Sequence, residues 1–144
     1  MIDRRGFITA AAGTSVLTAS GLSLAQDPVK VGFIYVSPIG DAGWTFQHDT
    51  GRKQMEQALK GKVQTRFVES VPEGADAERV IREMAQSGHQ IIFATSFGYM
   101  NYMERVSKQF PKIAFAHATG YKTGPNFGIY NARFYERSEE HTSE

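Results

Sequence analysis

Side chains suited to holding a flat organic ligand recur in four short segments, at 37–44, 69–74, 95–99 and 117–121. Each segment follows a run that we predict to be a β-strand. Aromatic rings stack on planar ligands, and hydroxyl or carboxylate groups hydrogen-bond to the rim of such ligands. The candidate lining residues are four aromatics, four hydroxyls and one carboxylate: Trp44, Phe97, Tyr99, Tyr121, Ser37, Thr95, Ser96, Thr119 and Asp41.

The sequence offers no catalytic constellation to accompany these residues. It lacks the G-x-G-x-x-G dinucleotide fingerprint and the G-x-x-x-x-G-K-[ST] phosphate loop. The stretch 94–98 would resemble a serine nucleophile elbow, but Ala94 stands where the first glycine is needed. The histidines do not have metal-ligand spacing, and no cysteine is present to act as nucleophile, zinc ligand or lipid anchor. We therefore predict a binding protein and no enzyme, with no catalytic residue, no metal and no cofactor.

Composition narrows the class of protein further. The formal net charge of +1 argues against a nucleic-acid partner, because such proteins usually carry a basic patch and a high pI. Hydrophobic residues make up 41% and charged residues 22%, which is typical of a globular chain. No apolar run reaches the eighteen or so residues that a membrane span requires.

The elements that must position the candidate residues alternate between strand and helix. Short apolar or alternating runs predict strands at 29–37, 63–68, 90–95, 113–118 and 127–131. Helical patterns predict helices at 44–59, 77–86 and 99–110, the second having the clearest apolar periodicity. Such alternation predicts an α/β fold with a doubly wound parallel sheet. Ligands of these sheets bind beyond the carboxyl ends of the strands, where all four candidate segments lie.

The two ends of the sequence have a different character from the rest. Residues 1–25 combine paired arginines, Arg4 and Arg5, with a weakly apolar stretch and small residues near Ala25. This pattern predicts a twin-arginine-like export signal that is cleaved near Ala25, and hence a periplasmic protein. Residues 137–144 match, residue by residue, the translation of a common short-read sequencing adapter. We expect that tail not to be native and the ligand-binding region to occupy residues 26–136.

Five strings in order resemble the basic membrane protein family, at 30–36, 40–49, 71–81, 117–121 and 132–136. Members are substrate-binding proteins of ABC importers with a fold similar to type I periplasmic binding proteins, associated with purine nucleosides or bases. The resemblance implies that this chain is a fragment comprising part of the N-terminal lobe. It also implies a purine-like small-molecule ligand and an ABC permease as partners.

The resemblance assigns roles to particular residues. Many members carry an Asp-x-Ser-Phe-Asn stretch after the first strand, and its aromatic ring stacks on the purine. The matching string here is 41–45, so Trp44 would stack on the base and Asp41 would orient the loop or contact a polar group. Gly43 and Thr45 replace the family's serine and asparagine. The loop with Ser96, Phe97 and Tyr99 would form the opposite wall.

Several alternatives remain open at this point. Trp44 could be a core aromatic at a helix start, Asp41 could cap that helix, and Phe97 could serve packing alone. A second class of function also remains, namely an exported α/β enzyme of nucleoside hydrolase-like character whose catalytic half is missing. A receptor would bind its ligand without turnover, whereas an enzyme would release product.

Overall fold

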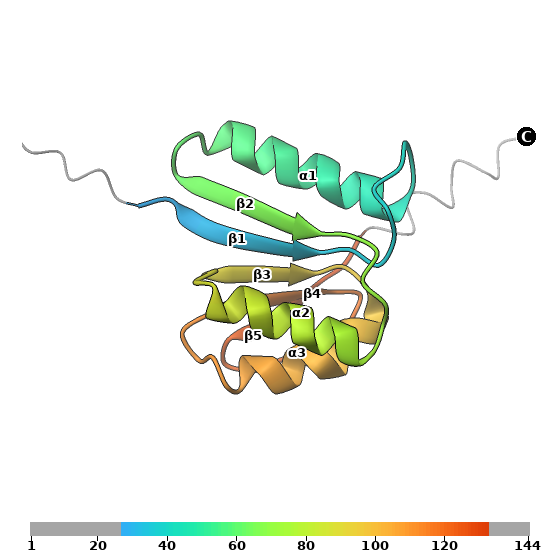
Figure 1. Cartoon of the computed structure of the whole chain (residues 1–144), viewed down its shortest axis with the longest axis vertical. Helices are drawn as coiled ribbons and strands as arrows, with labels where there is room; N and C mark the ends of the chain where they lie inside the picture. Colours follow the sequence, from blue (N-terminus) through green and yellow to red (C-terminus); the bar gives the residue numbers. More distant parts are fainter. Residues whose placement is uncertain (1–26, 133–144) are drawn as a thin grey trace, which may run out of the picture.

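A computed structural model describes residues 27–132, which form a five-stranded parallel sheet with three α-helices (Figure 1). The predicted signal at 1–25 and the predicted tail at 137–144 lie outside the described residues. The strands are β1 (Val29–Ile34), β2 (Val63–Val68), β3 (Ile91–Ala94), β4 (Ala114–Ala118) and β5 (Phe127–Tyr130). The helices are α1 (Trp44–Ala58), α2 (Ala75–Gln86) and α3 (Met100–Ser107), with a 3₁₀ turn, η1 (Phe97–Tyr99), before α3.

The strand order is β2-β1-β3-β4-β5, and every neighbouring pair is parallel. The chain moves from β1 outward to β2, returns past β1 to β3, and then continues to β4 and β5. The connections that leave β1 and β3 therefore run in opposite directions. This makes the space beyond the carboxyl ends of β1 and β3 the topological switch point, where ligands of such sheets bind. The predicted doubly wound α/β fold is confirmed.

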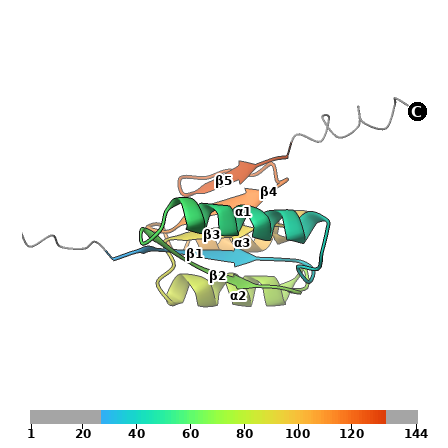
Figure 2. The same ribbon diagram turned by 90° about the horizontal axis from the view of Figure 1, so that it is seen from above.

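The helices lie on both faces of the sheet. Helix α1 covers one face, over β1 and β2, whereas α2 and α3 cover the other (Figures 1 and 2). The larger apolar cluster lies under α2 and α3. Apolar residues recur at helical spacing along α2, so they share the face of this helix that packs on the sheet. All five predicted members of that stripe are buried: Ala77, Val80, Ile81, Met84 and Ala85. The smaller cluster on the α1 face contains Val31, Phe33 and Tyr35 of the β1 segment.

The predicted elements are all present; β2 has the predicted bounds, and the other elements have shifted ends. Strand β1 ends at Ile34 instead of residue 37, although Tyr35 N still donates to Val68 O at 2.9 Å. The third helix begins at Met100 and not at Tyr99, because η1 turns the chain first. None of the helices within residues 27–132 is long and apolar enough to cross a membrane.

Candidate functional site

The site lies at the carboxyl ends of β1 and β3, where Trp44 joins the two connections. Trp44 is the first residue of α1, and Gly43 before it has the left-handed φ of 93° that turns the chain into the helix. The half-buried indole donates its Nε1–H to the carbonyl oxygen of Thr95, directly after β3. The ring therefore spans the switch point, and its polar atom is already used for positioning.

Aromatic side chains continue from Trp44 toward β5. The ring centroids of Trp44 and His48 are 4.5 Å apart, and those of His48 and Tyr130 are 6.0 Å apart. Tyr130 ends β5 and meets Phe93 edge-on at 6.0 Å. Sequence reasoning missed Tyr130. Its position at the end of a predicted strand was the available signal. Burial raises the pKa of the Tyr130 phenol, which therefore stays neutral and can donate a hydrogen bond.

The connection after β3 forms the second part of the site. The side chain of Phe97 is 55% exposed, so packing alone does not explain it. Its ring centroid lies 6.3 Å from that of Tyr121, which is 70% exposed and follows β4. Ser96, beside Phe97, donates its hydroxyl to Glu73. Two exposed rings at this edge offer the kind of surface that an aromatic ligand covers.

Asp41 is exposed on the same edge. The N-cap of α1 is Gly43 and no side chain caps the helix, so the capping alternative for Asp41 is wrong. Among residues 27–132 its carboxylate makes no hydrogen bond, which leaves it available to a ligand.

Two further predicted residues, Thr119 and Tyr99, occupy different environments. Thr119 is half-buried, and its N–H donates to Tyr130 O at 2.9 Å. Tyr99 is fully buried, and its hydroxyl donates to the carbonyl of Val71. The 3₁₀ turn rotates the Tyr99 ring into the core beneath the connection, so it is not on the site surface where we predicted it. Its hydroxyl contact joins η1 to the loop between β2 and α2.

Backbone strain also gathers at this edge. Ser70 and Thr119 have left-handed φ values of 57° and 64°, and both follow the carboxyl ends of strands. Such a conformation costs a non-glycine residue roughly 1–2 kcal/mol. Strained residues concentrate at functional sites, because the surrounding structure must hold them in place.

His117, at the end of β4, connects two walls of the site. The side chain is fully buried, and Nε2 is 2.7 Å from the carbonyl oxygen of Ser96. Nδ1 has no hydrogen-bond partner within the described part of the chain. Burial lowers the pKa of His117, against the raising effect of the hydrogen bonds to the Ser96 and Phe97 backbone. The imidazole is therefore neutral near pH 7 and donates Nε2–H to Ser96.

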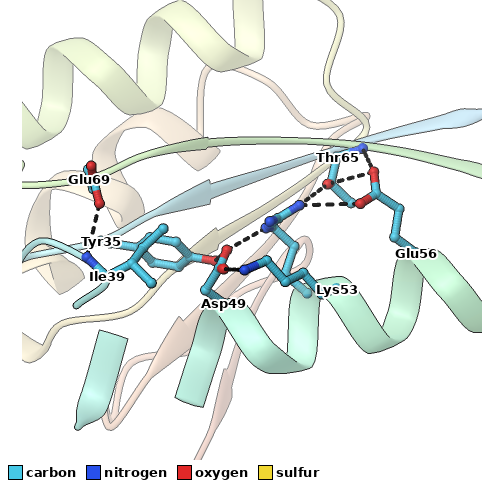
Figure 3. A network of polar contacts seen from close by, with 8 residues as sticks. Tyr35, Ile39, Asp49, Lys53, Glu56, Thr65 and Glu69 are labelled. Atoms are coloured by element: carbon cyan, nitrogen blue, oxygen red, sulfur yellow. Dashed lines mark hydrogen bonds and ion pairs between the residues drawn. The ribbon is translucent and has the colours of Figure 1, made fainter. Parts of the chain in front are cut away.

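A buried polar network holds α1, the helix that begins with Trp44 (Figure 3). Arg52 Nε donates to Asp49 Oδ1 at 2.7 Å, and Arg52 Nη1 donates to Thr65 Oγ1 of β2 at 2.7 Å. Lys53 Nζ lies 2.8 Å from Asp49 Oδ2. Burial disfavours the charged form of Asp49, but the hydrogen bonds from Arg52 and Lys53 outweigh it and lower the pKa of the carboxyl. The ion pairs thus lie within α1, and the hydrogen bond from Arg52 to Thr65 joins this helix to β2.

The opposite edge of the sheet has a shallow polar hollow of about 220 Å³. Its lining comes from the amino ends of β1 and β2 and from the chain after α2: Lys30, Gln64, Thr65, Arg66, Ser87 and His89. This edge is not where ligands bind to parallel sheets, and it has no aromatic wall. Among residues 27–132, no group of three or more His, Asp or Glu side chains could hold a metal ion.

Comparison with known proteins identifies a family. The profile of the Bmp family, described as ABC transporter substrate-binding protein PnrA-like, matches residues 28–140. A purine-binding protein of Brucella abortus is 56% identical over 116 residues, which cover 81% of this chain and 33% of the relative. A protein of Haloferax volcanii, described as a candidate glucose-binding protein of an ABC transporter, is 38% identical over 110 residues. That match covers 76% of this chain and 28% of the relative.

The fold also matches solved structures. A solute-binding protein of an ABC transporter system from Aeropyrum pernix superposes with a TM-score of 0.64 at 18% identity, covering 81% of this chain and 36% of that one. At this identity the likeness concerns the fold alone, and it agrees with the α/β fold described above. The chain spans about a third of the length of the curated relatives it matches.

Proposed function

We propose, because the chain belongs to the Bmp family of PnrA-like ABC transporter substrate-binding proteins, that it contributes part of a purine-binding site. In this proposal the protein binds a purine nucleoside or nucleobase outside the cytoplasm and delivers it to an ABC permease. The family consists of substrate-binding proteins, so the proposed activity is binding without turnover. The observation that carries the proposal is the position of Trp44, whose indole spans the switch point between β1 and β3.

The site residues have distinct roles in this proposal. Trp44 stacks on the base, and Phe97 contributes an exposed ring on the other side of the edge. Asp41 offers a carboxylate to the polar rim of the ligand. Ser96 and Thr119 offer hydroxyl oxygens as acceptors, because their O–H groups donate to Glu73 and to Ala118 O. The name of the Brucella relative supports a purine, whereas the name of the Haloferax relative makes glucose the comparison ligand.

The test uses a chimera in which residues 27–132 replace the matching region of the Brucella protein. Calorimetry with adenine, adenosine, guanosine, inosine and glucose should show saturable binding of a purine and none of glucose. Trp44→Ala should weaken that binding about tenfold to a few hundredfold, since stacking on a base is worth roughly 1–3 kcal/mol. Trp44→Phe should retain much of the affinity, because a smaller aromatic ring still stacks.

Two results would overturn the proposal. Purine binding by the Trp44→Ala chimera as tight as that of the parent would return Trp44 to a purely structural role. Release of a free base from adenosine or inosine, followed by chromatography, would favour a nucleoside hydrolase-like enzyme over a receptor.

A further inference from the structure

The loop between β2 and α2, residues 69–74, holds two carboxylates that reach different walls of the site. Glu69 Oε2 accepts the backbone N–H of Ile39 at 2.9 Å, in the β1–α1 loop that carries Asp41 and leads to Trp44 (Figure 3). Glu73 Oε1 accepts the backbone N–H of Gly98 at 3.1 Å and the hydroxyl of Ser96, on the wall that carries Phe97. One loop therefore contacts both walls, through side chains four residues apart.

The backbone of this loop is itself fixed. Tyr35 N donates to Val68 O at 2.9 Å, and Val71 N donates to Tyr35 O at 3.0 Å, so the loop is held to the end of β1. Val71 is buried, and its carbonyl accepts the hydroxyl of Tyr99 from η1. Ser70 adopts a left-handed backbone that lets the chain turn between the two carboxylates. A loop so anchored can impose positions on its neighbours.

Surface carboxylates commonly pair with a Lys or Arg side chain, but Glu69 and Glu73 do not within residues 27–132. Both residues are exposed. Each accepts hydrogen bonds only from neutral groups, and each bond ends on a site loop. Hydrogen bonds from neutral donors to an ionised acceptor are stronger than those between neutral groups. These contacts therefore order loops.

The Glu73 carboxylate lies in close contact with Gly98. A Cβ atom added at Gly98 would lie 2.2 Å from Glu73 Cδ and 2.6 Å from Glu73 Oε1. Both distances are far below van der Waals contact, so a Gly98→Ala side chain would push the carboxylate away. This substitution breaks the contact from the other partner and leaves the carboxylate in the protein.

We propose that Glu69 and Glu73 are positioning residues that set the relative placement of the two walls, and hence of Trp44 and Phe97, for the ligand. The effect on ligand binding rests on the proposed function. The effect on the placement of Trp44 rests on the contacts of Glu69 and Glu73 alone. Trp44 reports on both walls, because its indole donates to Thr95, the residue before Ser96.

The first test measures purine binding in the chimera. Glu69→Ala and Glu73→Ala should each weaken binding about three- to tenfold, as expected for the loss of one or two loop hydrogen bonds. Gly98→Ala should match Glu73→Ala. Glu73→Gln should stay within about threefold of the parent, because its amide oxygen still accepts both hydrogen bonds. The control is Glu83→Ala, an exposed carboxylate on α2 that pairs with Arg79 far from the site edge, and it should not change binding.

The second test uses the 144-residue chain, in which Trp44 is the single tryptophan. Glu69→Ala, Glu73→Ala and Gly98→Ala should move its emission to longer wavelength and increase its quenching by acrylamide, whereas Glu83→Ala should not. If the parent chimera binds no purine, the proposed function fails, and the emission of these variants then decides the positioning role. Unchanged emission, or a binding chimera whose three variants match the parent, would overturn the inference.

Discussion

Helices α2 and α3 bury a continuous apolar cluster on one face of the sheet, whereas α1 is held to the other face largely by polar groups. The first cluster includes Ile81, Met84 and Met103, all nearly inaccessible to solvent. The residues that α1 buries are instead Thr45, Asp49 and Arg52. Thus two helices of one small domain are held to its sheet by different forces.

This difference matters because α1 begins with Trp44. The hydrogen bond from Arg52 to Thr65 of β2 is directional, so it favours one rotation of α1 against the sheet. We infer that the polar face fixes where the indole lies, and that the apolar face supplies most of the hydrophobic stabilisation. The two faces should therefore respond differently to substitution.

The largest effect should come from Asp49→Ala. It removes the closer carboxylate of Arg52, whose side chain is 9% exposed, and leaves this buried guanidinium with only the partly exposed Glu56, whose Oε2 lies 3.3 Å from Nη1. Breaking a buried ion pair in this way costs about 3–5 kcal/mol. Urea unfolding followed by circular dichroism measures the loss. The control is Asp76→Ala, whose exposed carboxylate pairs weakly with Arg79 at 3.8 Å and should change stability by less than about 0.5 kcal/mol. A loss below about 1 kcal/mol for Asp49→Ala would contradict the importance of the pair.

Met84→Ala on the other face should cost slightly less, about 2–4 kcal/mol. The side chain is buried and packs against Gly32, so its removal leaves a cavity in the larger cluster. Its cost should add to that of Asp49→Ala within about 0.5 kcal/mol, because the two sites share no partner across the sheet. Emission of the folded Met84→Ala chain should match the parent, whereas Asp49→Ala should shift Trp44 emission. A shift in both variants would mean that the faces are not independent.

The same difference explains what the sequence could predict. The stripe on α2 has the helical period, so its buried residues were predictable one by one. The buried face of α1 has no such stripe, since Asp49 and Arg52 resemble surface residues until β2 supplies Thr65. Tyr99 followed a recognisable strand, but the 3₁₀ turn that rotates its ring inward has no clear local pattern. The contacts of Glu69 and Glu73 join residues 23 to 30 positions apart, so no local pattern indicates them.

The next smaller effect should be a dependence of stability on pH that comes from His117, on the face of the sheet covered by α2 and α3. Burial lowers the pKa of this imidazole below its usual 6.5, so the unfolded chain takes up the proton more readily than the folded one. Its contribution to stability is therefore complete above about pH 6.5 and is lost as the pH falls below that value. His117→Gln retains a donor for Ser96 O but does not titrate. Urea midpoints at about pH 7.5 and about pH 5.5 should differ less in His117→Gln than in the parent. An equal difference in both chains would show that other groups cause it.

The smallest effect should be that of Lys53→Ala on the α1 face. Lys53 is 66% exposed, and exposed ion pairs contribute about 0–1 kcal/mol. Its partner atom, Asp49 Oδ2, is buried and has no other hydrogen-bond partner within residues 27–132, which argues for a larger loss. Alanine, however, opens the path that the lysine stem occupied, and a water molecule can then reach Oδ2. We therefore expect a loss below about 1 kcal/mol for Lys53→Ala.

Lys53→Met keeps the stem and excludes that water, so it should cost more, about 1–3 kcal/mol for an unsatisfied buried acceptor. Urea unfolding measures the loss in free energy of unfolding for Lys53→Ala and for Lys53→Met. Equal losses in the two variants would show that access of water to Asp49 does not determine the loss.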